Sequence, residues 1–239
     1  DWDYMNKMYL LGFTVAEVMI AMAIVGVIAA ITVPTIMANY QRQTLTTQFQ
    51  KNYVDLEQNL TFLQAENYAK TNMYSSILNK KDGKDIADTS GKFLKEYYQV
   101  QKDCETTAQP CFASAYWNIS SSTSANFTCN DGYTITTKSG TAICIIPASI
   151  ATDEETGTET KNPAKVFIDV NGAEDPNIAG RDLFTFNIYE DYSINEIDPA
   201  LSDEEKQTAK TQLMAGCTTS NNGEGCFTRL LENDWKMNY

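Results

Sequence analysis

The segment of residues 169–182 gathers oxygen-bearing side chains on a stretch of chain that is expected to turn sharply. It contains Asp-x-Asn-Gly, part of a calcium-loop pattern, and calcium takes about six to eight oxygen ligands from such a backbone. The third acidic position and the terminal glutamate spacing of an EF-hand are missing. A plain turn is the alternative, because Asn-Gly and Asp-Pro are strong turn formers. A calcium site here would use the side chains of Asp169, Asn171, Asp175, Asn177 and Asp182.

Six cysteines form the second group of residues whose side chains could form covalent bonds or bind a metal. They lack the Cys-x-x-Cys spacing of zinc and thioredoxin-like sites, and all of them follow the most apolar stretch of the chain. Disulfides are natural if this part of the protein lies outside the cytoplasm, and free buried thiols are the alternative. The simplest connectivity joins neighbours in sequence: Cys104–Cys111, Cys129–Cys144 and Cys217–Cys226.

Composition excludes several kinds of catalysis and disfavours one kind of partner. The chain of 239 residues has no histidine, which excludes Ser-His-Asp and Cys-His catalysis and zinc sites that need imidazole. No spacing among the carboxylates stands out from a solvated acidic surface, so we expect no enzyme and no catalytic residues. The 31 Asp and Glu outnumber the 18 Lys and Arg, and the net charge of −13 disfavours binding to nucleic acid.

A long helix must come first in the chain. From Val18 to Gln41 there are 24 residues without a charge, and a bilayer core about 30 Å thick needs roughly 20 helical residues. A cleaved signal peptide, a permanent anchor and a buried core helix are the competing interpretations. The apolar stripe continues at helical spacing through Leu45, Phe49, Leu56, Leu60 and Leu63, while polar residues occupy the other faces. We therefore predict one helix over about residues 13–68, with a kink or local loosening at a proline, Pro34.

Residues 12–17, Gly-Phe-Thr-Val-Ala-Glu, followed by this apolar helix, resemble the processing signal of type IV pilins and type II secretion pseudopilins. The resemblance implies that residues 1–12 are a leader, cut by a prepilin peptidase between Gly12 and Phe13, and that Phe13 becomes N-methylated. It implies that Glu17 pairs with the N-terminal amine of a neighbouring subunit, and that Gly26 and Pro34 loosen the helix.

The leader departs from the pattern of that family in its charge. Family leaders are usually basic, whereas residues 1–12 carry two aspartates and one lysine, a net charge of −1. Met5 and Met8 are alternative starts of the chain. This departure bears on the efficiency of processing rather than on the class of protein.

The rest of the chain divides into a continuation of the helix and a folded domain. We predict a transmembrane and polymerisation helix over residues 13–40, its amphipathic continuation over 41–70 and an extracytoplasmic domain over 71–239. Strands are predicted over 133–137, 142–146, 165–170 and 183–189, and a helix from the Ser202 capping box to Gly216. Residues 93–100 read as a short helix or strand, and 79–91, 113–128 and 151–162 as loops. An N-terminal helix packed on an antiparallel sheet is an α+β fold, which is also the usual pilin fold.

The expected function is therefore structural. The resemblance implies a filament subunit of a pilus or a type II secretion pseudopilus, with copies of itself or other pilin-like subunits, the prepilin peptidase and the inner membrane as partners. The subunit would lie in the inner membrane before assembly and in a cell-surface filament afterwards. The alternatives are a minor pseudopilin at a filament tip and a singly anchored surface domain that binds calcium or another ligand. No cofactor is expected, apart from the calcium considered above.

Overall fold

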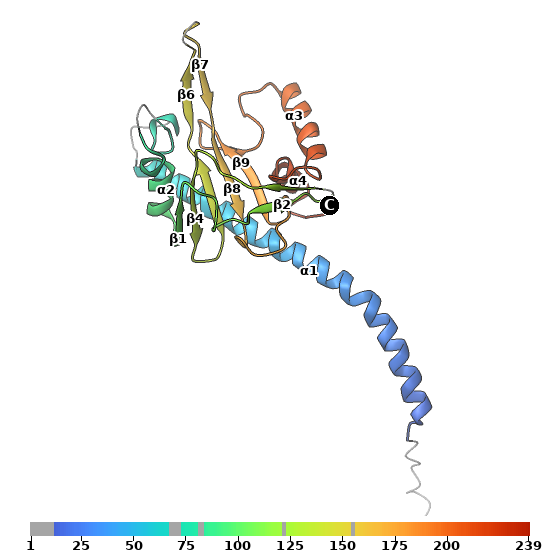
Figure 1. Ribbon diagram of the computed structural model, residues 1–239. Helices are drawn as coiled ribbons and strands as arrows, with labels where there is room; N and C mark the ends of the chain where they lie inside the picture. Colours follow the sequence, from blue (N-terminus) through green and yellow to red (C-terminus); the bar gives the residue numbers. More distant parts are fainter. Residues whose placement is uncertain (1–11, 67–72, 81–83, 121–122, 154–155) are drawn as a thin grey trace, which may run out of the picture. The chain divides into compact units, whose positions relative to one another are not determined.

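The computed structural model describes residues 12–66, 73–80, 84–120, 123–153 and 156–239. The predicted leader, except for Gly12, and the alternative starts therefore lie outside the described residues. The chain divides into two compact units, Asp1–Arg42 and Gln43–Tyr239. One helix, α1 (Val15–Glu66), passes from the first unit into the second and contains 52 residues (Figure 1). Its bounds fall just inside the predicted range of 13–68.

The described part of the first unit consists of residues 12–14 and the apolar part of α1. The α-helix is continuous through Pro34, although this residue has no N–H to give to the carbonyl of Ala30. The hydroxyl of Thr32 donates to the carbonyl oxygen of Ile28 at 2.9 Å, and that of Thr35 donates to Ile31 at 3.3 Å. Both threonines thus satisfy their hydroxyls within the helix, which suits a surface without water.

In the second unit, α1 packs on an antiparallel sheet with the strand order β1-β4-β5-β8-β9-β10 (Figure 1). Its buried face carries Phe49, Leu56, Leu60 and Leu63, the stripe that the helical spacing predicts. Phe49 stacks on Phe184 with ring centroids 4.0 Å apart. The α+β class is confirmed. The strands are β1 (Val100–Glu105), β4 (Tyr133–Thr137), β5 (Ala142–Ile146), β8 (Ala164–Asp169), β9 (Leu183–Ile188) and β10 (Ile194–Asn195).

The prediction of a surface loop over residues 113–128 is wrong. This segment forms the hairpin-like pair β2 (Ala115–Trp117) and β3 (Ser124–Asn126). Its aromatic residues Tyr116 and Phe127 are buried, and together with Phe112 they build a second, smaller core. Isolated aromatic residues among serines, threonines and asparagines give no strand pattern, so their burial was not visible in the sequence.

The prediction of a loop over residues 151–162 is also wrong, because β6 (Ser149–Thr152) and β7 (Glu159–Asn162) pair as an antiparallel ribbon. Both strands are largely exposed, so no alternation of apolar and polar residues marks them.

Residues 93–100, predicted as a short helix or strand, form the end of α2 (Ser90–Tyr97) and the start of β1. Within the predicted loop 79–91, the described part includes the short helix η2 (Ile86–Asp88), and η1 (Met73–Ser75) precedes it.

Two helices and three disulfides complete the second unit. Helix α3 (Asp203–Gly216) begins with the predicted capping box at Ser202, and α4 (Cys226–Glu232) was not predicted. All three predicted disulfides are present, and no described cysteine is free. The bond between Cys217 and Cys226 joins the end of α3 to the start of α4. It therefore fixes a polar loop of residues 218–225 that has no regular structure of its own.

Candidate functional site

Of the three predicted assembly residues, Gly26 and Pro34 lie within α1, and Glu17 lies at its start, where it forms a capping box with Thr14. The backbone N–H and the hydroxyl of Thr14 both donate to Glu17 Oε2 at 2.8 Å. In return the backbone N–H of Glu17 donates to the Thr14 hydroxyl at 3.2 Å. A capping box satisfies helix N–H groups that have no partner within the helix. Glu17 thus has a local role in the single chain, and the Thr-x-x-Glu spacing was its signal in the sequence.

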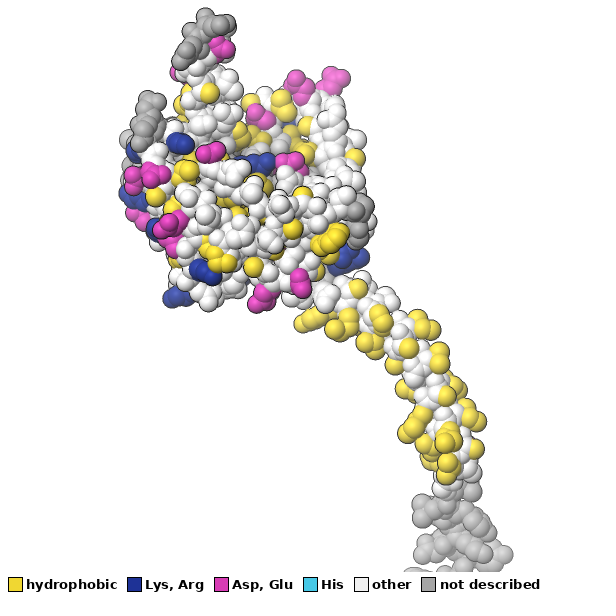
Figure 2. Space-filling view, in the orientation of Figure 1, with side chains coloured by type: hydrophobic (Ala, Val, Ile, Leu, Met, Phe, Trp, Pro, Cys, Tyr) yellow, Lys and Arg dark blue, Asp and Glu magenta, His cyan; other side chains and the backbone are white. Residues whose placement is uncertain are grey.

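Between this cap and Tyr40, the surface of α1 is apolar on every side. Its most apolar 18-residue window has a mean hydropathy of 2.4 and is not buried by the chain itself. Phe13 and Pro34 are exposed, and a Cβ atom added at Gly26 would meet no atom within 4 Å. Figure 2 shows hydrophobic side chains along the visible face of this helix. Of the helices in the described chain, α1 alone is long and apolar enough to cross a membrane.

The five residues of the calcium hypothesis lie at the end of β8 (Asp169) and in the loop that joins β8 to β9, and most of their polar atoms bind the loop itself. Asp182 Oδ1 accepts the backbone N–H groups of Ile178 and Leu183 at 2.8 and 2.9 Å. The amide nitrogen of Asn171 donates to the carbonyl oxygen of Asp175 at 2.9 Å. The amide nitrogen of Asn177 donates to the exposed carboxylate of Asp175, also at 2.9 Å. These bonds build the turn that was the alternative interpretation.

Asp169 and Asp182 differ from the other residues of this loop because both are fully buried. Burial and the nearby charge of Asp182 raise the pKa of Asp169 well above its ordinary value. Burial likewise raises the pKa of Asp182, to about 7, although backbone N–H groups lower it. The hydroxyl of Tyr116, from β2, donates to Asp169 Oδ2. Ionising these two buried carboxyl groups beside each other is therefore costly, and the pair destabilises the second core at neutral pH.

Three oxygen atoms of this loop are buried and have no hydrogen-bond partner in the described structure: Asp182 Oδ2, Asn171 Oδ1 and Asn177 Oδ1. Such atoms suit a calcium ligand set that mixes carboxylate and amide oxygens. Nevertheless, the described residues contain no group of three or more His, Cys, Asp or Glu side chains that could hold a metal. Calcium binding stays a prediction, with Asp175 on the surface rather than among the buried oxygens.

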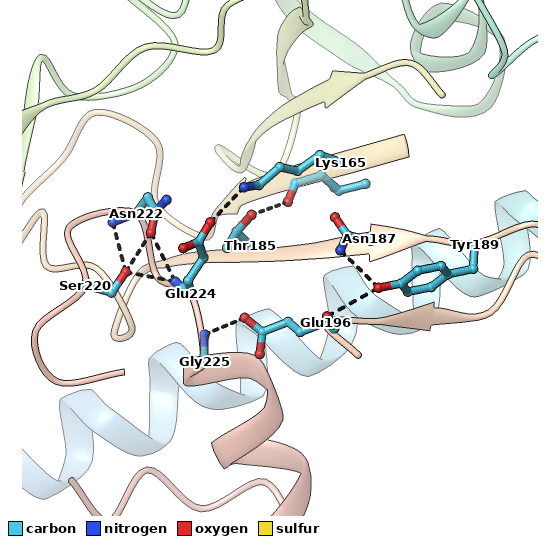
Figure 3. A network of polar contacts seen from close by, with 10 residues as sticks. Lys165, Thr185, Asn187, Tyr189, Glu196, Ser220, Asn222, Glu224 and Gly225 are labelled. Atoms are coloured by element: carbon cyan, nitrogen blue, oxygen red, sulfur yellow. Dashed lines mark hydrogen bonds and ion pairs between the residues drawn. The ribbon is translucent and has the colours of Figure 1, made fainter. Parts of the chain in front are cut away.

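A polar network at the C-terminal end, which the sequence did not reveal, holds the disulfide loop on the sheet (Figure 3). Glu196 Oε1 accepts the N–H of Gly225 at 2.5 Å, and Oε2 accepts the N–H and hydroxyl of Thr228 at 2.8 and 2.6 Å. Burial raises the pKa of Glu196, although these bonds lower it. Lys165 Nζ lies 2.8 Å from Glu224 Oε1. Glu196 thus caps α4 from a distant part of the chain.

Comparisons with family models, curated proteins and solved structures give no match to this chain. Its function must therefore be argued from its own sequence and geometry. Two features stand out: an exposed apolar helix with a capped charge at its start, and a disulfide-bonded domain whose polar groups are mostly satisfied internally.

Proposed function

We propose that this chain is a type IV pilin-like filament subunit, of a pilus or a type II secretion pseudopilus. A prepilin peptidase cuts it between Gly12 and Phe13, and the subunit then assembles through its N-terminal helix. It performs no chemistry itself. The observation that carries the proposal is the helix surface of residues 15–40, which is apolar all round and covered by nothing in the described chain.

Such a surface needs either lipid or other protein against it. Side chains such as Met19, Met22 and Ile31 are 68%, 70% and 69% exposed, and burying each contributes about 1.5–3 kcal/mol. A bilayer can cover this surface in the single subunit. Copies of the same helix can cover it in a filament, where helices replace lipid as one another's surroundings.

Glu17 gives this assembly a specific contact. A carboxylate buried among apolar helices is costly unless a positive charge pairs with it. Cleavage before Phe13 creates an amine four residues upstream of Glu17, and the amine of a neighbouring subunit can supply the partner. An intact leader would leave no amine at this place, which is why processing precedes assembly in this proposal.

The Glu17→Gln variant tests the proposal. Glutamine also fits the capping box, so the start of α1 is preserved and only the charge is lost. The variant should insert in the membrane and be cleaved, because removing a charge eases insertion and Gly12 is unchanged. Filament assembly should fail, since an unpaired buried charge costs about 3–5 kcal/mol.

The measurement is the ratio of subunit in the sheared surface fraction to subunit in the membrane fraction. Electron microscopy of the sheared fraction shows whether filaments are present. Glu57→Gln, on the exposed polar side of α1 in the second unit, is the matched control and should assemble normally. Filaments of normal abundance from Glu17→Gln would exclude the pairing role. Membrane-bound wild-type subunits without filaments would favour the singly anchored domain instead.

A further inference from the structure

A cleft of about 830 Å³ lies between α3, the strand β3 and the loop closed by the Cys217–Cys226 disulfide. This volume is within the range of about 300–1,000 Å³ that is usual for ligand sites. The surface of the second unit is hollowed beside α3 in the view of Figure 2. Residues 125–128, residue 167 and residues 209–224 approach one another there, so the fold and not one local turn makes the cleft.

The charge of the cleft points to an uncharged ligand. The chain has a net charge of −13, yet Glu224 is the one ionisable side chain among the described residues that line the cleft. Its carboxylate is neutralised by Lys165, whose Nζ lies 2.8 Å from Oε1 (Figure 3). A charged ligand would therefore find no opposite charge free to pair with it. Electrostatic complementarity favours a neutral molecule.

The side chains of the cleft combine amide groups with an apolar floor. Asn126 and Gln212 are exposed on opposite walls, and each amide offers both donors and an acceptor. The apolar surface of the cleft comes mainly from Ala125 and Leu213, because Phe127 and Phe167, which also line the cleft, are only 5% and 6% exposed. A sugar ring presents an apolar C–H face and a rim of hydroxyls that donate and accept. The two surfaces therefore match.

The walls are held in place before any ligand arrives. The amide of Asn221 donates to the carbonyl oxygens of Tyr116 and Thr123 at 3.2 and 3.0 Å, which ties the disulfide loop to β2 and to the residue before β3. Within the loop, the hydroxyl of Ser220 donates to Asn222 Oδ1 at 2.6 Å (Figure 3). A site that is already ordered loses little conformational entropy on binding.

We infer that this cleft binds a neutral oligosaccharide. An extended peptide added to β3 is the weaker fit, because this strand has three residues and offers little backbone for pairing. The inference does not depend on filament formation, since every residue of the cleft belongs to the second unit. A chain that fails to assemble should still bind.

The test is an array of neutral and acidic oligosaccharides, probed with the full chain in a detergent that has no sugar headgroup. An array of random decapeptides is probed beside it. We expect neutral oligosaccharides to bind and the affinity for the best of them to fall at least tenfold in Asn126→Ala and in Gln212→Ala. Both side chains are exposed, so the fold should survive their loss.

Gln207→Ala supplies the matched control, because Gln207 is an exposed amide of the same helix, outside the cleft. This variant should bind as the wild type does. Absence of binding to every neutral oligosaccharide, binding confined to acidic oligosaccharides, or equal losses in all three variants would overturn the inference. Binding of decapeptides alone, if lost in Asn126→Ala, would assign the cleft to peptides instead.

Discussion

The buried Asp182 should make the wild-type protein less stable as the pH rises. Replacing it by asparagine should abolish this pH-dependent destabilisation. In the folded protein the pKa of Asp182 is raised from 3.8 to about 7, mainly by burial. Between pH 3.8 and about 7, Asp182 therefore keeps its proton in the folded state and has released it in the unfolded state. The contribution of Asp182 to stability must then fall as the pH rises through this window and level off above it.

The magnitude follows from the same two values. The difference between 3.8 and about 7, at about 1.4 kcal/mol for each pKa unit, corresponds to about 4 kcal/mol. Asparagine keeps an oxygen for the N–H groups of Ile178 and Leu183, and it carries no charge toward Asp169. At pH 8 we expect Asp182→Asn to be more stable than the wild type by up to about 4 kcal/mol. Near pH 4, where Asp182 is protonated, this advantage should vanish.

The assay is urea unfolding of the full chain between pH 4 and 8, followed by tryptophan fluorescence. Asp175→Asn is the matched control, because it removes an exposed carboxylate from the same loop and leaves the buried pair intact; it should give no comparable gain in stability at pH 8. Parallel pH profiles for the wild type and Asp182→Asn would refute the reasoning about this pair.

Calcium provides a second measurement on the same variants. If a calcium ion uses the buried oxygens of Asp169, Asn171, Asn177 and Asp182, 1 mM-scale calcium should raise the midpoint of wild-type unfolding at pH 8, and chelation should reverse the effect. Asp182→Asn should show a much smaller response, since it loses one charged ligand. An unchanged wild-type midpoint would exclude the calcium hypothesis and leave the proton as the neutralising partner.

Three further predictions concern processing and stability. Mass spectrometry should find a methylated N-terminus at residue 13 in assembled protein, and Gly12→Val should leave the leader attached; an intact leader on filaments would contradict this. Replacing Cys217 and Cys226 together by serine should cost about 2–4 kcal/mol of stability, and an unchanged midpoint in non-reducing urea unfolding would contradict it. Glu196→Gln should destabilise the protein in the same urea unfolding assay by about 1–3 kcal/mol, because both carboxylate oxygens accept N–H groups at the start of α4 and the amide nitrogen of glutamine can accept neither; no change would show that solvent replaces the lost acceptor.

The parts of the fold that could be predicted are those whose residues carry a local pattern. Strands β4 and β5 have the predicted bounds, because β-branched residues alternate there and a Gly-containing turn separates them. Helix α3 was marked by its capping box at Ser202, and α1 by its length and spacing. In each case the signal lies within a few residues of the element that it defines.

The parts that could not be predicted depend on contacts between distant residues. Strands β2 and β3 are held partly by the amide of Asn221, about one hundred positions later in the chain. Glu196 caps a helix that starts thirty residues after it, and nothing near Glu196 announces this role. The cleft beside α3 combines residues 125–128, residue 167 and residues 209–224, so no motif in the sequence could have indicated it.

The capping box at the start of α1 adds a physical reason for the order of processing and assembly that we propose. In the single chain the carboxylate of Glu17 is satisfied by Thr14, at the end of the helix where the dipole is positive. Cleavage would place a charged amine at Phe13, beside the same positive end, and this is unfavourable for an isolated helix. A second carboxylate, from the Glu17 of a neighbouring subunit, would relieve that repulsion while the first keeps its cap. Processing would therefore make association more favourable than it was for the precursor, and the neutral Glu17→Gln variant would lose this gain although its helix remains capped.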